Sequence, residues 1–133
     1  GMQDQFHTFN MFDCQAWFAR DVIMQKIKIP DNAEVENDIN KWVSMEEKLE
    51  NPDQMIDFQT EYTKELHSLS DYPEINFELI RKHFKEWEHH KVEDIMTYRN
   101  KSFSSPVTGS VAPVHHTPWK SAMDDSLKTF LNK

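Results

Sequence analysis

The sequence predicts a mostly α-helical protein of about five helices joined by long irregular loops, in one unit spanning residues 1–133. Apolar residues recur at three- and four-residue spacing along most of the chain, as they do on one face of a helix. Prolines and turn residues interrupt this pattern between the segments, at Pro30, Pro52 and Pro73. Aromatic residues make up 12% of the chain, which indicates a packed core rather than a disordered polymer.

The first predicted helix runs from Met11 to Ile29, after a polar and aromatic loop at residues 1–10. Apolar side chains cover nearly its whole circumference, whereas a surface helix normally has one polar face. Such a helix is usually surrounded by protein on all sides. A free chain of 133 residues has little material with which to cover it. Pro30 ends the helix.

Two helices are predicted next, each with its own start signal. Asp31 and Glu34 have the spacing of a capping box, so a second helix begins at Asp31. Asn51-Pro52 begins a third helix, which continues to about Ser70. The expected buried stripes are Val35, Ile39, Trp42 and Leu49 in the second helix, and Met55, Phe58, Tyr62, Leu66 and Leu69 in the third.

A fourth helix is predicted from Phe77 to His90, with Phe77, Ile80, Phe84 and Trp87 on its buried face. Regular structure is expected to fade between Lys91 and Pro118, where Ser, Thr and Pro are frequent. A loop of this length inside a compact domain is usually functional. Thr117-Pro118 opens a last helix, whose apolar face is Trp119, Met123, Leu127 and Phe130.

Composition excludes several classes of function. Phosphate-binding loops require glycine, and the two glycines, Gly1 and Gly109, cannot form a dinucleotide or nucleoside triphosphate motif. A net charge of −8 argues against binding to nucleic acid. No apolar run is long enough for a membrane span, and no signal peptide is recognised. One cysteine, Cys14, allows no internal disulfide, so we expect a cytoplasmic protein.

Histidines and carboxylates suggest a metal site only weakly. His89 and His90 are adjacent and would point in different directions on a helix, although Glu86 and His90 could share a face. No HExxH or CxxC pattern is present, so no metal ligands are predicted and a metal-dependent hydrolase is the third-ranked interpretation. His115 and His116 are expected to have structural or pocket-lining roles. Cys14 is expected to be an inert apolar side chain.

Two loop segments have side chains suited to a flat heterocyclic ligand. Residues 1–10 and the run TYRNKSF combine amides, a hydroxyl and Arg99 with aromatic rings. From the residues alone, two ordinary surface loops are the preferred explanation of these segments.

Longer strings are more specific. The run GMQDQFHTFNMFDCQAWFARDVI resembles the segment that closes the FAD-binding domain of bacterial flavin-containing monooxygenases, and especially of the trimethylamine monooxygenase type. DYPEINFELIRKHFKEWEHHK, IMTYRNKSF and APVHHTPWKSAMDDSL resemble the C-terminal region of the same family, in the same order. The resemblance covers essentially the whole chain, and about the last third of such an enzyme.

This resemblance implies a fragment of an FAD- and NADP-binding α/β monooxygenase. Residues 1–29 would close the FAD domain, 31–90 would form a helical region, and 91–133 would supply a cofactor-site loop and the last helix. The family uses NADPH, FAD and molecular oxygen to form a flavin C4a-hydroperoxide, which oxidises a small amine or sulfide. In the trimethylamine group the product is trimethylamine N-oxide.

The resemblance also implies cofactor contacts. Gln5 and Thr8 match family positions that contact FAD, and Arg99 matches one that contacts NADP; no catalytic residue is implied in this chain. His7 and Cys14 stand where the family is expected to have an aromatic and a small residue. Without the glycine-rich motifs, the isolated chain is expected to be inactive, to hold neither cofactor tightly and to form a homodimer. The alternative is a non-catalytic helical interaction module.

Overall fold

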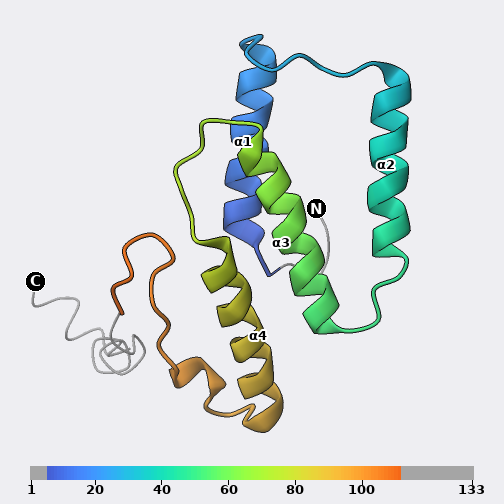
Figure 1. Ribbon diagram of the computed structural model, residues 1–133. Coiled ribbons are helices and arrows are strands. Elements are labelled where there is room, and N and C mark those ends of the chain that lie inside the picture. Colours follow the sequence, from blue (N-terminus) through green and yellow to red (C-terminus); the bar gives the residue numbers. More distant parts are fainter. Residues whose placement is uncertain (1–5, 112–133) are drawn as a thin grey trace, which may run out of the picture.

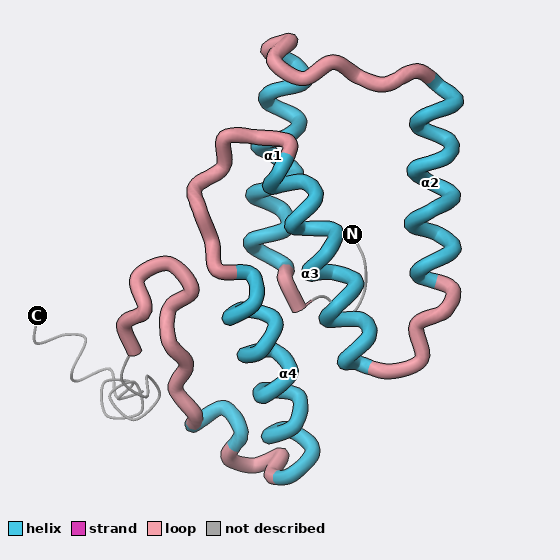
Figure 2. Tube along the Cα trace, viewed as in Figure 1, coloured by secondary structure: helices cyan, strands magenta, loops and turns pink. Residues whose placement is uncertain are grey.

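The computed structural model describes residues 6–111, which form four α-helices and one short 3₁₀ helix (Figure 1). These elements are α1 (Thr8–Ile23), α2 (Asn32–Glu46), α3 (Pro52–Ser68), α4 (Phe77–Glu93) and η1 (Tyr98–Asn100). No strand is drawn over this part of the chain in Figure 2, and its one β-bridge joins Ser104 to Val111. The prediction of a mostly helical fold is confirmed. The predicted last helix after Pro118 lies outside the described residues.

Helix α3 is the centre of the arrangement, because it contacts α1, α4 and α2. Ile56, Gln59, Thr60 and Thr63 of α3 are buried against this neighbourhood. The predicted stripe contained only one of the buried residues, Phe58. The prediction was incomplete because a helix with three neighbours buries more than one face, and the second face is mostly polar.

Helix α1 begins and ends earlier than the sequence predicts. It begins at Thr8 rather than Met11, although no side chain caps it. It ends at Ile23 rather than Ile29 because Gln25 adopts a positive φ of 58° and Lys26 N–H bonds back to the Asp21 carbonyl at 2.8 Å. This is a Schellman ending. Glycine usually occupies this left-handed position, so the early end at Gln25 could not be predicted from residue type.

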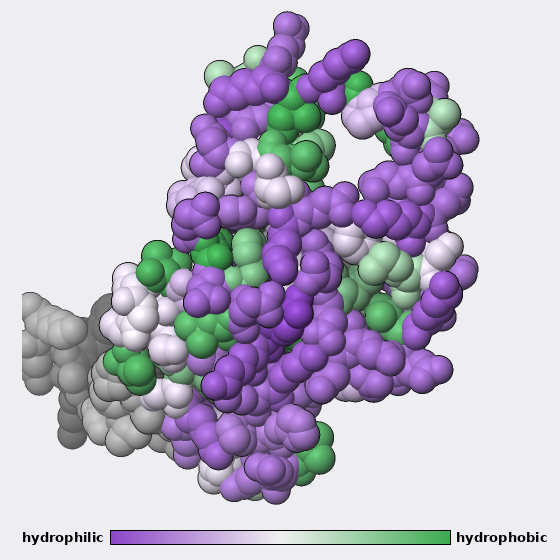
Figure 3. All heavy atoms as spheres, viewed as in Figure 1, coloured by the Kyte–Doolittle hydropathy of each residue, from purple (hydrophilic) through white to green (hydrophobic). Residues whose placement is uncertain are grey.

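Helix α2 is the least covered element. Its predicted capping box is present, with Asp31 accepting from Glu34 N–H and Glu34 accepting from Asp31 N–H. The predicted stripe, however, is not buried, and Ile39 is 54% exposed. Trp42 is the main contact, packing edge-on against Phe58 and Tyr62 of α3. Figure 3 shows an opening between the upper parts of α1 and α2 even with all heavy atoms drawn.

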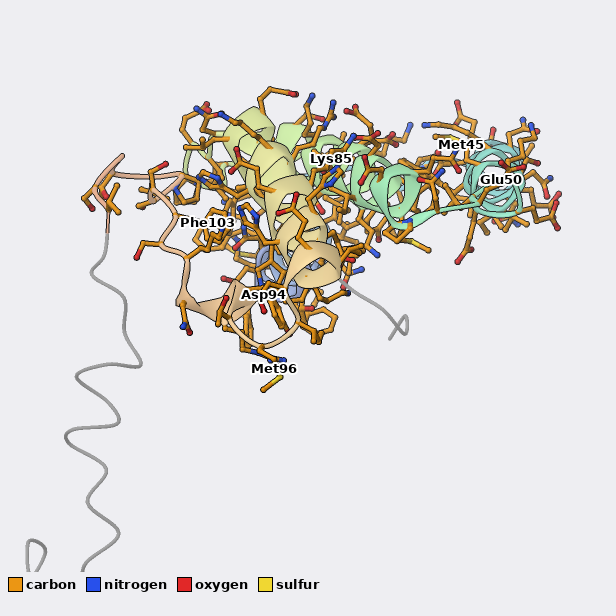
Figure 4. The ribbon with its side chains drawn as sticks, turned by 90° about the horizontal axis from the view of Figure 1, so that it is seen from below. Met45, Glu50, Lys85, Asp94, Met96 and Phe103 are labelled. Atoms are coloured by element: carbon orange, nitrogen blue, oxygen red, sulfur yellow. The ribbon has the colours of Figure 1, made fainter. Side chains whose placement is uncertain are left out.

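Helix α4 extends three residues beyond the predicted end at His90, to Glu93. Asp94 then forms a tight turn, because its carboxylate accepts the backbone N–H groups of Met96 and Thr97. The Thr97 hydroxyl also donates to this carboxylate, and together these bonds lower the pKa of Asp94. The segment after α4 is therefore ordered by local bonds despite its irregular backbone. Figure 4 shows Met96 pointing away from the helices.

None of the helices within residues 6–111 is long and apolar enough to cross a membrane.

Candidate functional site

A groove of about 780 Å³ lies where the start of α1, the start of α3, helix α4 and the segment after η1 come together. Its lining is largely aromatic and aliphatic, with a few polar groups. The principal lining residues are Phe6, Asn10, Met55, Ile80, His83, Phe84, Trp87, Glu88, Lys91, Phe103 and Ser104. Figure 4 shows Phe103 beside α4, on the side away from Met45 and Glu50.

Helix α4 is contacted by both segments for which the sequence predicts cofactor contacts, the one around Thr8 and the one around Arg99. Phe6 and His7, directly before Thr8, contact the Phe84 ring with centroid distances of 5.8 and 5.0 Å. Tyr98, directly before Arg99, contacts the Trp87 ring at 5.2 Å. Because Phe84 and Trp87 are three residues apart on one helix, they lie on the same face. Helix α4 thus brings together two segments that are about 90 residues apart in sequence.

Thr8 is the first residue of α1 and is half-buried, whereas Gln5 lies outside the described residues. The backbone just before Thr8 is held from α3. Gln59 Oε1 accepts the N–H of Phe6 at 2.8 Å and the N–H of His7 at 3.4 Å. A buried side chain 53 residues away in sequence therefore holds the start of α1, which no side chain caps within the described residues.

His7 supplies a second link to α3. Its Nε2 lies 2.9 Å from Thr60 Oγ1, and Thr60 Oγ1 donates its own proton to the Ile56 carbonyl at 2.7 Å. The hydroxyl has one proton, so His7 Nε2–H must be the donor in the first bond. Burial, together with the positive charge of Arg81, lowers the pKa of His7 to about 4. The imidazole is neutral at pH 7.

Arg99 lies on η1 and is exposed, with its guanidinium 4.4 Å from the centre of the Tyr98 ring. The other two arginines are paired with carboxylates, Arg20 with Asp21 and Arg81 with Glu61. No carboxylate within residues 6–111 forms an ion pair with Arg99. A planar guanidinium is suited to pair with an anionic group such as a phosphate.

The polar groups of the groove are mostly neutralised by one another. Lys91 Nζ bonds Glu88 Oε1 at 2.6 Å and lies 5.0 Å above the Trp87 ring. His83 Nε2 is 3.1 Å from the Ser104 carbonyl oxygen, which can only accept, so this nitrogen carries the proton. This part of the groove is therefore suited to covering a largely apolar or planar group.

The residues considered for metal or nucleophile chemistry do not form a reactive centre in the described part of the chain. His90 Nδ1 lies 3.5 Å from Glu93 Oε2, and Glu86 Oε2 lies 3.4 Å from His83 Nδ1. Within residues 6–111, His, Cys, Asp and Glu side chains form no group of three able to hold a metal ion. Burial and the neighbouring Asp13 raise the pKa of Cys14 to about 11, so its thiol is unreactive. His115 and His116 lie outside the described residues.

No protein-family model matches the chain. It is 88% identical over all 133 residues to the trimethylamine monooxygenase of Pelagibacter sp. strain HTCC7211, and 52% identical to that of Methylocella silvestris. In both cases the chain spans about 30% of the relative's length.

A solved structure has the same fold. The crystal structure of Tmm from Pelagibacter sp. strain HTCC7211 matches 98% of the chain with a TM-score of 0.86 and 88% sequence identity, and the match covers 30% of that protein. The resemblance drawn from the sequence is confirmed: the chain is a fragment of a protein of the trimethylamine monooxygenase family.

Proposed function

We propose that the complete protein is an NADPH- and FAD-dependent monooxygenase that converts small methylated amines to N-oxides, with trimethylamine as the principal substrate. The observation that carries this proposal is 88% identity to a trimethylamine monooxygenase along the whole chain. The overall reaction consumes the amine, O₂, NADPH and a proton, and yields the N-oxide, NADP⁺ and water. A small sulfide is the other substrate class with a comparable lone pair.

The chain contributes one side of both cofactor sites. Gln5 and Thr8 supply an amide and a hydroxyl to FAD, which when bound carries out the oxygen transfer. The rigid start of α1 supports this role, because α3 holds the residues beside Thr8 through Gln59. Arg99 binds the anionic part of NADPH, in keeping with its exposed guanidinium. Side chains lining the groove, including Trp87 and Phe103, exclude water from the region between these groups.

The isolated chain lacks activity, because a glycine-rich phosphate loop cannot be formed from Gly1 and Gly109. A reducing compartment such as the cytoplasm suits the buried free thiol of Cys14. Exposed apolar residues on α1, including Phe9 (83% exposed) and Ile23 (80%), favour a dimer of the isolated chain.

The test uses the complete protein. Purified enzyme should carry FAD and oxidise NADPH faster when trimethylamine is added, with one equivalent of N-oxide formed per NADPH consumed. Comparison with dimethyl sulfide at equal concentration separates the two substrate classes. NADPH oxidation that produces only hydrogen peroxide with either compound would contradict the proposal.

A further inference from the structure

We infer that Gln59 and Thr60 of α3, together called the α3 support, are positioning residues that set the geometry of the flavin-contacting start of α1. This inference rests on the proposed function, and it extends that function to residues that do not themselves contact cofactor. The juxtaposition that carries it is the pair of hydrogen-bonded links between α3 and residues 6–7, which directly precede Thr8.

Within the described residues, no side chain caps the start of α1. His7, in the N-cap position, makes no side-chain cap hydrogen bond, and the first turn contains no acidic residue. Gln59 Oε1 instead accepts two consecutive backbone N–H groups, those of Phe6 and His7. Two donors converging on one buried oxygen fix the direction in which the chain enters α1.

Thr60 holds the side chain of His7. Its hydroxyl accepts from His7 Nε2–H at 2.9 Å, and both side chains are almost completely buried. His7 also packs against the Phe84 ring at 5.0 Å, so the imidazole is confined between α3 and α4. A shift of His7 would break this bond inside a region closed to water, where lost hydrogen bonds are not replaced.

Buried polar side chains are unexpected in the middle of α3 unless they have hydrogen-bond partners. Gln59, Thr60 and Thr63 are fully buried beside Ile56, where apolar side chains would pack without any need for hydrogen-bond partners. The two hydroxyls differ in what they do. The hydroxyls of Thr60 and Thr63 each donate a hydrogen bond at 2.7 Å to the backbone carbonyl four residues earlier in α3. The Thr60 hydroxyl also accepts a hydrogen bond from His7, at the start of α1, whereas the Thr63 hydroxyl does not. Thr63 is therefore a matched internal control.

The experiment measures the dissociation constant of FAD for the complete apoenzyme. Thr60→Val removes the hydroxyl with little change in volume and should weaken FAD roughly fivefold, the equivalent of one hydrogen bond. Thr60→Ser should restore the affinity. Thr63→Val should change it less than twofold, on the order of additivity error. The visible circular dichroism of bound flavin should change in Thr60→Val alone, while the KM for NADPH at saturating FAD stays constant.

A second pair of variants gives an independent result. His7→Phe keeps a ring against Phe84 but removes Nε2–H, so it should weaken FAD as Thr60→Val does. Combining the two substitutions should produce no further loss, because both remove the same bond. Fully additive losses, or equal losses in Thr60→Val and Thr63→Val, would overturn the inference.

The proposed function fails in a distinguishable way. The monooxygenase function is rejected if the complete protein forms no N-oxide. If Gln5→Ala and Thr8→Val leave FAD affinity unchanged, the flavin does not contact this segment, and the α3 support is rejected together with that contact. If those two variants weaken FAD and Thr60→Val does not, the flavin site stands and the α3 support alone is rejected.

Discussion

The indole Nε1–H of Trp17 on α1 donates a hydrogen bond to Asp71 Oδ1 at 2.6 Å, across 54 residues of sequence. Asp71 follows α3, so the bond ties the middle of α1 to the turn that leads toward α4. Arg20 also pairs with this carboxylate and lies 4.3 Å from the Trp17 ring centre. The Trp17 bond, reinforced by Arg20, lowers the pKa of Asp71 to about 2.

This arrangement predicts a specific acid titration. Because the folded pKa of Asp71 is below its ordinary value of 3.8, its contribution to stability is present above pH 3.8 and is lost as the pH falls toward 2. Carboxyl NMR of the chain should give an Asp71 midpoint near 2. Trp17→Phe, which keeps a ring beside Tyr72, should raise that midpoint, whereas Trp42→Phe should leave it in place. An unchanged midpoint in Trp17→Phe would show that the indole bond does not form.

The lowered pKa of His7 implies that the free energy of unfolding also depends on pH in a milder range. Its pKa is about 4 in the folded chain and 6.5 when exposed, so the unfolded state takes up a proton first as the pH is lowered. Stability should therefore fall between pH 6.5 and pH 4. Urea unfolding at pH 7 and pH 5 measures this, and His7→Phe should remove part of the difference. His89→Phe, at an exposed position on α4, is the control. The same pH dependence in His7→Phe as in the parent would refute the assignment.

Much of the helical fold could be predicted from local signals. The capping box at Asp31 and the Asn51-Pro52 start both occur where the sequence places them, and Asn51 accepts a hydrogen bond from Gln54 N–H at 3.0 Å. These features involve residues three or four apart, which sequence spacing reveals. The early end of α1 at Ile23 was not predictable, because its left-handed position carries Gln25 instead of glycine.

The buried residues that hold the start of α1 could not be predicted from local spacing. Long strings resembling a known family pointed to Thr8 and Arg99. By contrast, the burial of Gln59 and Thr60 depends on where α1 and α4 pack, and residues 53 apart form these bonds. One sequence feature could have indicated this second buried face: Thr60 and Thr63 lie on the same helix face as Ile56. A stripe of small polar residues beside an apolar stripe can indicate a second buried face.

In the complete enzyme, replacing Arg99 should weaken the binding of NADPH but not that of FAD. Arg99→Ala should raise the KM for NADPH, with a loss of roughly 1.5–3 kcal/mol from charge-assisted hydrogen bonds, and should leave FAD affinity nearly constant. Arg99→Lys should recover part of the loss, because a single ammonium cannot reproduce the planar fork. Lys82→Ala, at an exposed position on α4, is the control for removing one positive charge. Weakened FAD with an unchanged KM for NADPH would be inconsistent with the assignment.

The isolated chain should be colourless and should not consume NADPH in the presence of trimethylamine. It contributes one side of the proposed cofactor sites but cannot form a glycine-rich phosphate loop. The measurement is absorbance between 350 and 500 nm, roughly the flavin range, after incubation with FAD and desalting. A retained flavin band would mean that Thr8 and its neighbours bind the cofactor without the rest of the enzyme.

Uncovered apolar surface predicts that the isolated chain self-associates. Phe9 and Ile23 on α1 are more than three-quarters exposed, and Ile39 on α2 is more than half exposed. Each large apolar side chain left in water forgoes roughly 1.5–3 kcal/mol of burial, so several together favour pairing of chains. A symmetric dimer is the simplest closed assembly that covers them.

Light scattering at micromolar concentration measures the mass directly, and we expect a dimer of the 15.9 kDa chain. Ile39→Lys and Phe9→Lys place a charge in each exposed surface, so the variant that shifts the protein toward monomer identifies which helix forms the interface. Val107→Lys changes an apolar residue outside the helices that is 69% exposed, between Ile39 (54%) and Phe9 (83%), and should have no effect. A monomeric mass at every concentration would show that the exposed residues of α1 and α2 do not drive association, and would favour a self-standing helical module.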